Sequence, residues 1–208
     1  MTPDQELLRA LEMGKVCLHP AGTMPGLTCA IENPKAMQEL LAFKLRAPGK
    51  PFIGLISNLD QAFKFWKPVS RSWRLALESI WPAHLTVIHG AQPVSFPLGE
   101  NRSLALRMPD FSMSDQWMNE VLRSLDVPFP STSVNISGEP PAESWEEAVL
   151  FAKQYDIFVP HVPIDPVFPG TPSTVIQICD DRSYRLVRTG GFDPSKLKTF
   201  DIDEIFKT

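Results

Sequence analysis

The chain has 208 residues, of which 43% are apolar, so a sizeable core can form in one large domain or two small ones. The net charge of −4 excludes a whole-chain basic field for gripping nucleic acid, although a local basic groove stays open. Three scattered cysteines without a CxxC pair argue against a disulfide framework or a zinc site, and they are typical of a reducing cytosol.

Neither a membrane span nor a signal peptide is expected. No apolar run approaches the roughly 20 residues that cross a bilayer, and the N-terminal stretch "MTPDQELLRALEMGK" has the spacing of an amphipathic helix. We therefore expect a soluble, cytoplasmic protein.

The predicted elements alternate between helices and short apolar strands. Helices are expected over 4–13, 34–46, 60–66, 70–80, 113–125 and 143–155, and strands over 15–20, 51–57, 84–90, 103–109, 173–180 and 183–190. The last two strands resemble a hairpin with "DDR" at its turn, and "AGTMPGL" at 21–27 reads as a loop. This mixture predicts one α/β domain.

The common nucleotide and hydrolase motifs are missing. The chain contains no GxxxxGK[ST] loop, no GxGxxG after a strand and no GxSxG. The four histidines, at 19, 84, 89 and 161, show no metal-ligand spacing. Each is better explained as structural or exposed, and no metal site on protein side chains is predicted.

Polar groups instead follow several strands. The segment "PFPSTSVNISGEPP" at 128–141 ends an apolar approach with Ser131, Thr132, Ser133 and Asn135. Ser173 in "GTPSTV" precedes a strand, and Arg188 in "LVRTGG" follows one. Turn chemistry explains each alone. Together they favour a ligand site, because ligands of open α/β sheets bind at strand ends.

Cations form the second group of candidates. Lys44, Arg46 and Lys50 lie in "FKLRAPGKP", where they either complement a helix C-terminus or clamp a phosphate. Arg107 in "SLALRMPD" either pairs with Asp110 or binds a carboxylate substrate.

In chain order, these segments resemble the YrdC-like family, whose members are threonylcarbamoyl-AMP synthases, from about residue 5 to 192. The family's P-T-D/E-T-V-Y-G-L loop corresponds to "PAGTMPGL", its K-x-R to Lys44-Leu45-Arg46, its K-P to Lys50-Pro51, its W-P-G-P-L-T to "WPAHLT", its V-R-x-P-D to "LRMPD", its S-x-N to Ser133-Val134-Asn135, its P-S-T-V to 172–175 and its L-R-P-G to "VRTGG". The order and spacing of these matches make the resemblance specific.

The resemblance implies a single domain over 1–208, with a core at about 5–192 and a C-terminal tail at 193–208. Its fold would be a twisted mixed α/β sheet with flanking helices that encloses a positively lined cavity. The implied reaction joins L-threonine, bicarbonate (or CO2) and ATP, as its Mg²⁺ complex, into threonylcarbamoyl-AMP and pyrophosphate. Downstream proteins would transfer the group to tRNA as the t6A modification, with possible contact to tRNA itself.

The resemblance also implies roles for the candidate residues. Lys44, Arg46, Ser133 and Asn135 would be catalytic, and together with Lys50 and Arg188 they would bind ATP. The threonine would be held by Thr23, Ser103, Arg107, Ser131 and Ser173, with Arg107 on its carboxylate.

The chain departs from the family pattern in the opening loop and in one strand. Gly22 replaces the loop acid, Pro25 its aromatic residue and Ala21 its threonine, while Ala83-His84 replaces a Gly-Pro. A non-catalytic or altered-specificity protein that binds a nucleotide or RNA is therefore the alternative. A carbamoyl-transfer domain of hydrogenase maturation is disfavoured, because no acylphosphatase segment or zinc-finger cysteines accompany it.

Overall fold

The computed structural model describes residues 1–44, 52–94 and 96–205, with only the backbone described at residue 44. Within these residues, nine strands form one sheet in the order β1-β2-β6-β3-β5-β4-β7-β8-β9. The strands are β1 Cys17–Pro20, β2 Pro25–Thr28, β3 Ile53–Leu55, β4 Leu85–Gly90, β5 Ser103–Arg107, β6 Phe129–Ser133, β7 Thr174–Asp180, β8 Ser183–Arg188 and β9 Asp203–Glu204. The pairs β3–β5, β4–β7 and β8–β9 are parallel and the others antiparallel, so the sheet is mixed.

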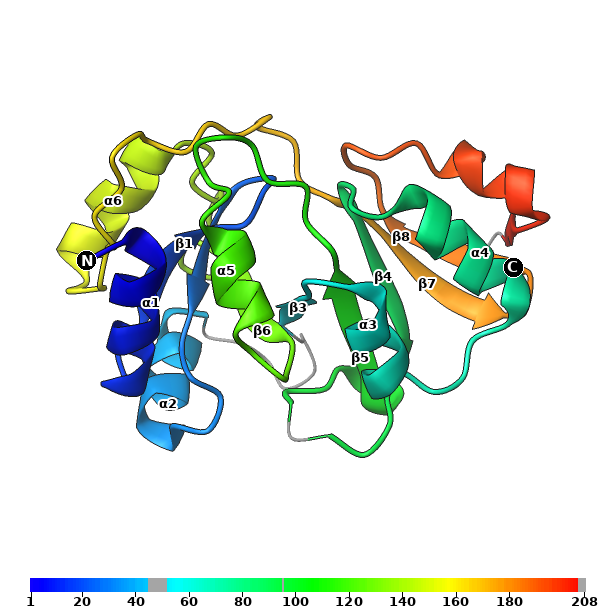
Figure 1. Cartoon of the computed structure of the whole chain (residues 1–208), viewed down its shortest axis with the longest axis horizontal. Coiled ribbons are helices and arrows are strands. Elements are labelled where there is room, and N and C mark those ends of the chain that lie inside the picture. Colours follow the sequence, from blue (N-terminus) through cyan, green and yellow to red (C-terminus); the bar gives the residue numbers. More distant parts are fainter. Residues whose placement is uncertain (45–51, 95, 206–208) are drawn as a thin grey trace.

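The helices flank this sheet (Figure 1). They are α1 Pro3–Glu12, α2 Pro34–Lys44, α3 Leu59–Phe65, α4 Arg71–Ile80, α5 Met118–Arg123 and α6 Trp145–Gln154, with 3₁₀ turns η1 Glu100–Arg102 and η2 Pro194–Phe200. Figure 1 shows α1, α2 and α6 gathered near β1, and α4 near β7, β8 and the C-terminus. Ser144 caps the start of α6, because its Oγ accepts a hydrogen bond from the Glu147 amide at 3.2 Å.

Strand alternation divides the side chains between two sides of the sheet. On β4 and β5, the residues Leu85, Val87, Leu104 and Leu106 enter the larger core, which also contains residues of α2, α3, α4 and α6. A smaller core packs α1 and α5 over β1, β3 and β6. The intervening residues of β4 and β5 therefore face away from the larger core, and this is the side on which the candidate site lies.

The sequence-based elements differ from the structure at several places, and β6 was not among the predicted strands. Residues 21–27 were expected to be a loop, but pairing with β1 and β6 makes Pro25–Thr28 strand β2. The predicted helix 113–125 contains only α5, because residues 113–117 form turns. The described part of the expected tail belongs to the core: Leu197 and Ile202 are fully buried, and β9 pairs with β8.

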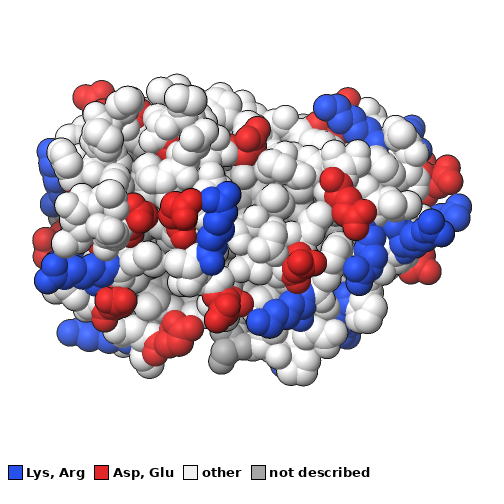
Figure 2. Space-filling model, in the orientation of Figure 1, with Lys and Arg blue, Asp and Glu red and all other residues white. Residues whose placement is uncertain are grey.

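Charges of both signs are scattered over the face seen in Figure 2, without one large basic patch. This distribution agrees with the acidic net charge. In the described residues, no helix combines the length and the apolar character that a bilayer crossing requires.

Candidate active site

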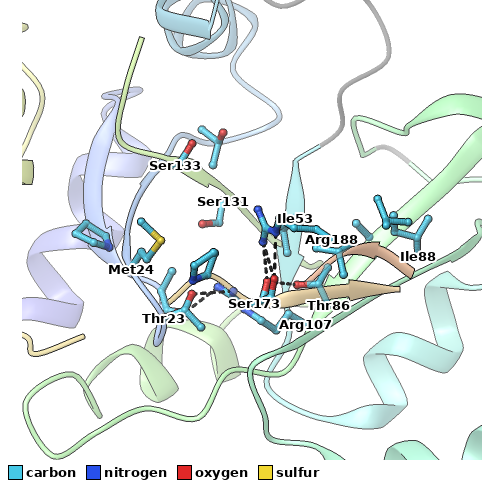
Figure 3. A pocket seen from close by; sticks show the side chains of 17 residues that line it. Thr23, Met24, Ile53, Thr86, Ile88, Arg107, Ser131, Ser133, Ser173 and Arg188 are labelled. Carbon is cyan, nitrogen blue, oxygen red and sulfur yellow. Dashed lines mark hydrogen bonds between the residues drawn. The ribbon is translucent and has the colours of Figure 1, made fainter. Parts of the chain in front are cut away.

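A cavity of about 560 Å³ opens on the side of the sheet away from the larger core (Figure 3). Its wall consists of Ala21, Thr23, Met24, Pro25, Ile53, Thr86, Ile88, Ala105, Arg107, Ser131, Thr132, Ser133, Pro172, Ser173, Val175, Val187 and Arg188. Two arginines and several hydroxyls therefore face a largely apolar space. Among these described lining residues there is no Asp or Glu, so the fixed charge of the wall is positive.

Strand geometry explains the shape of this wall. Thr86, Ile88 and Ala105 occupy the positions of β4 and β5 that alternate with core leucines and valines. Ile53 on β3 pairs with Ala105 on one side and with Ser131 on the other, so the row continues across three strands. Small side chains in this row leave the space open.

Arg107 is a nearly buried cation at the end of β5, with 4% of its surface exposed. Its guanidinium donates to Thr23 Oγ1 at 2.9 Å and to the Ala21 carbonyl at 2.8 Å, while its Nε has no partner. Burial, together with the nearby charge of Arg188, lowers the pKa of Arg107 to about 10, so it stays charged at neutral pH.

No described carboxylate forms an ion pair with Arg107, and the expected alternative of a pair with Asp110 is not found in the structure. A buried charge without a counter-ion is costly. The arrangement therefore favours the binding of an anion, such as a carboxylate, beside this guanidinium.

Arg188 approaches the same cavity from the end of β8. Its Nη2 donates to the Ser173 carbonyl at 2.8 Å and to Ser173 Oγ at 3.1 Å, and its Nε donates to that carbonyl at 3.1 Å. Ser173 Oγ also shares a hydrogen bond with Thr86 Oγ1 at 2.9 Å. This connected set holds an exposed cation at the rim of the cavity (Figure 3).

The two glycines after Arg188, Gly190 and Gly191, lie close to other parts of the protein. A Cβ on Gly190 would lie 2.2 Å from the Pro172 carbonyl oxygen, and one on Gly191 would lie 3.1 Å from His84 Nδ1. Gly190 thus lets the chain pass against the backbone of 172–174, and the close approach is to protein.

The polar stretch after Pro130 is the last part of β6 rather than a separate loop. Ser131 and Ser133 both line the cavity, whereas Asn135 is not among its lining residues. Ser133 Oγ donates to Asn135 Oδ1 at 2.7 Å, and Asn135 Nδ2 donates to the Glu139 carbonyl at 2.6 Å. Asn135 therefore lies outside the cavity lining and links Ser133 by hydrogen bonds to the following turn.

Ser103 is not where the resemblance placed it. It is the first residue of β5 and faces the same side as Ala105 and Arg107, but it pairs with Gly90 beyond the cavity and does not line it. The strand separates Ser103 from Arg107 at its other end, and the contact of Ser103 with threonine stays a prediction.

The proposed phosphate clamp cannot be placed. Arg46 and Lys50 lie outside the described residues, as does the side chain of Lys44, whose backbone ends α2. The roles assigned to these three cations stay predictions.

The opening loop carries the largest departures from the family pattern. Gly22 has φ +78°, and a Cβ there would lie 3.1 Å from the Asp110 carbonyl oxygen and 3.2 Å from Pro109 Cβ. The loop thus packs against the segment after β5. At the position of the family acid, the backbone has a left-handed conformation that favours glycine.

Motif reasoning missed several lining residues, among them Met24, Ile53, Thr86 and Ile88. Thr86 carries a usable signal, because it is a polar residue at an alternate position of the otherwise apolar strand "LTVI". The apolar lining residues carry no such signal, because in the sequence they look the same as residues of the hydrophobic core.

Within the ranges that the structure describes, no three His, Cys, Asp or Glu side chains gather in a way that could hold a metal ion. The polar side chains that line the cavity are guanidinium groups and hydroxyls, which can bind an anion.

Comparison with known sequences identifies the family. The Sua5/YciO/YrdC family, described as "Telomere recombination", matches residues 9–190. Since the match covers most of the chain, the protein belongs to this family.

Relatives include proteins named threonylcarbamoyl-AMP synthase. One from Blochmanniella pennsylvanica is 31% identical over 69% of this chain and 74% of its own, and one from Vibrio campbellii is 27% identical over 69% and 77%. One from Bacillus subtilis is 26% identical over 95% of this chain, which spans only 57% of that relative.

Solved structures share the fold. A P. abyssi Sua5 complexed with L-threonine has a TM-score of 0.79 at 20% identity, covering 97% of this chain and 58% of its own. E. coli YciO has a TM-score of 0.74 at 20% identity, covering 94% and 92%. The likeness confirms the predicted α/β fold with its mixed sheet, and the chain spans about 60% of Sua5.

Proposed function

We propose that this protein is a threonylcarbamoyl-AMP synthase, which forms threonylcarbamoyl-AMP and pyrophosphate from L-threonine, bicarbonate (or CO2) and ATP. The observation that carries the proposal is the cavity with Arg107 and Arg188 on its wall and no carboxylate among its described lining residues. The family membership, the names of the relatives and the threonine complex of Sua5 support the same activity.

The reaction requires two anions to be held side by side. The neutral threonine amine first forms an N–C bond to CO2 with loss of a proton, or to bicarbonate with loss of water. An oxygen of the resulting carbamate then attacks the α-phosphorus of ATP. A carbamate O–P bond forms, the bond between the α-phosphorus and the bridging oxygen breaks, and pyrophosphate leaves. Fixed cations lower this barrier by neutralising charge and by aligning the reactants.

The residues divide the work by position. Arg107 offers a two-pronged donor to the threonine carboxylate, assisted by Thr23, which accepts one of its hydrogen bonds. Arg188, at the rim, faces the nucleotide with Ser133 nearby on the wall. Lys44, Arg46 and Lys50 would complete the phosphate contacts.

ATP enters this scheme as its Mg²⁺ complex. The described lining offers hydroxyls but no carboxylate, so the ion would be held chiefly by the phosphates. Use of the product for t6A modification of tRNA by downstream proteins follows from the proposed activity, as does a cytoplasmic location.

The test is pyrophosphate release by the purified protein, measured with ATP alone and after adding L-threonine and bicarbonate separately and together. We expect release only when all three are present, and detection of threonylcarbamoyl-AMP by mass spectrometry. Arg107→Met is the matched control, which we expect to need at least about tenfold more L-threonine for the same release.

A nucleotide- or RNA-binding protein without turnover is the second candidate, favoured by the changes at Gly22 and Pro25 in the loop. ATP binding without any threonine-dependent pyrophosphate release would select this candidate and reject the synthase.

A further inference from the structure

His19 on β1 is a fully buried histidine next to the cavity wall, although it does not line the cavity. Its ring packs edge-on against Phe129, with the ring centres 4.9 Å apart. Motif reasoning gave this residue no role beyond a structural one. Its two ring nitrogens have different surroundings, and this difference defines what the side chain can do.

Nδ1 of His19 lies 2.9 Å from the Pro20 carbonyl oxygen. A carbonyl only accepts hydrogen bonds, so Nδ1 carries the proton of the neutral ring, and Nε2 presents a lone pair. Within the described residues, Nε2 is buried and has no hydrogen-bond partner. A buried acceptor without a donor is costly, which points to a partner that is engaged in another state.

The surroundings of Gly26 on β2 indicate that this partner is the Ser131 hydroxyl. Gly26 pairs with His19 on one side and with Ser133 on the other. A Cβ on Gly26 would lie 2.6 Å from His19 Nε2 and 2.8 Å from Ser131 Oγ, so the two polar atoms flank one point above the glycine. Ser131 lines the cavity, and its hydroxyl separates the histidine from the cavity space.

We propose that His19 is a specificity-determining positioning residue. When an amino acid binds, His19 Nε2 accepts a hydrogen bond from the Ser131 hydroxyl. A rotation about the Cα–Cβ bond of Ser131 directs the hydroxyl toward the ring. The serine oxygen then has only lone pairs left for the cavity, so it accepts a strong, charge-assisted hydrogen bond from an ammonium group and only a weaker one from a neutral hydroxyl. This inference rests on the proposed function, because it names how that site selects an amino group.

The position of Arg107 fits this role. Its guanidinium reaches Thr23 and Ala21, in the turn that joins the two strands carrying His19 and Gly26. Arg107 and Ser131 both line the cavity, so a carboxylate bound to Arg107 would share that space with the Ser131 hydroxyl. The two groups of an α-amino acid, one accepting and one donating, match a guanidinium and an acceptor hydroxyl.

The experiment compares the binding of L-threonine with that of 2,3-dihydroxybutyrate, its α-hydroxy acid counterpart, by calorimetry without ATP. We expect the unmodified protein to prefer threonine. In His19→Phe the serine hydroxyl is free to donate, so threonine affinity falls about tenfold while the affinity for the hydroxy acid is kept. His19→Gln, whose amide oxygen accepts near the same position, restores most of the preference.

Two further variants separate positioning from packing. Ser131→Ala is expected to lose the same preference and to show no further loss when combined with His19→Phe. Thr28→Val is the matched control, since Thr28 Oγ1 is also buried and without a hydrogen-bond partner among the described residues, on the same strand as Gly26 but off the cavity wall. It should keep the preference.

The outcomes distinguish this inference from the proposed function. An unchanged preference in His19→Phe or in Ser131→Ala overturns the role of His19 even if pyrophosphate is released. A preference that depends on His19 without pyrophosphate release upholds the role and rejects the synthase. Absence of threonine binding by the unmodified protein overturns both.

Discussion

Arg188 holds Ser173 by both of its oxygens: the guanidinium donates twice to the Ser173 carbonyl, at 2.8 and 3.1 Å, and once to its hydroxyl, at 3.1 Å. The last residue of β8 is joined in this way to the residue that precedes β7, at the rim of the cavity. The contact uses carbonyl and hydroxyl acceptors, so the positive charge of Arg188 is not neutralised by it. A bound phosphate would therefore meet an oriented cation.

Replacing Arg188 by Met is expected to raise the KM for ATP about tenfold, because a charge-assisted contact to phosphate is lost. Ser173→Ala should raise it only about two- to threefold, since the two hydrogen bonds to the carbonyl remain. Steady-state pyrophosphate release at saturating threonine measures both.

Arg185→Met is the control for this pair, because Arg185 lies on the same strand but bonds to Gln177 and does not line the cavity. An increase in the KM for ATP as large as that of Arg188→Met would show that the effect comes from general loss of positive charge.

Arg107 makes a second, different prediction. Arg107→Met should raise the threonine requirement by about tenfold or more while ATP affinity is kept, because the fork that binds the carboxylate is removed. Its free energy of unfolding should fall by less than about 1 kcal/mol, or rise, since the variant also removes a buried cation without a described counter-ion. Chemical denaturation checks the second part.

Arg107→Lys keeps the charge and loses the planar fork of the guanidinium. Its threonine requirement should therefore lie between those of the unmodified protein and Arg107→Met. A substitution to Met that weakens ATP and threonine equally would contradict the carboxylate role.

The sequence predicts most helices and strands here because their signals are local. Periodicity places α1, α4 and α6, and Ser144 marks the start of α6. Strand β2 could not be recognised, since Pro25-Gly26 has turn chemistry and becomes a strand only through pairing with two distant segments.

The sequence likewise predicts some residues of the candidate site and not others. Motif order brought Thr23, Arg107, Ser131, Ser173 and Arg188 together, and the structure places all five on one cavity. His19 has no such signal, because a buried histidine in a strand looks like core until its free nitrogen and the glycine facing it are seen. Ser103 does not line the cavity, because a place on the same face of a strand does not fix the position along it.

The clamp of Lys44 and Arg46 stays a prediction from the sequence. Lys44→Ala and Arg46→Ala should each weaken ATP binding by roughly 1.5–3 kcal/mol, because each removes a charge-assisted phosphate contact. Lys35→Ala, at the start of the same helix as Lys44, is the control. Calorimetric titration with ATP measures the effect, and unchanged affinity in both variants would refute the clamp.

Restoring the family acid in the opening loop is expected to harm this protein. Gly22→Asp should lower the free energy of unfolding by about 1–2 kcal/mol, because position 22 has φ +78° and the new Cβ would approach the Asp110 carbonyl oxygen at 3.1 Å. Gly22→Ala, measured beside it in urea, gives the cost of the Cβ alone. A more stable or more active Gly22→Asp protein would show that the loop rearranges.

Acid should destabilise the protein partly through His19. Burial lowers the pKa of His19 from 6.5 to about 4, assisted by the charge of Arg107, and only the Pro20 carbonyl opposes this. Between pH 6.5 and 4 the unfolded chain takes up a proton that the native ring does not, so stability falls as the pH falls through this window. The whole contribution is about 3 kcal/mol.

His19→Gln removes the titrating group, so its loss of stability between pH 7 and pH 4.5 should be smaller than that of the unmodified protein by about 2 kcal/mol. His84 and His89, whose pKa values burial also lowers, act in the same direction in both proteins and cancel in the difference. Urea midpoints at the two pH values measure this difference, and equal losses in the two proteins would mean that His19 takes up its proton as readily in the folded state as in the unfolded one.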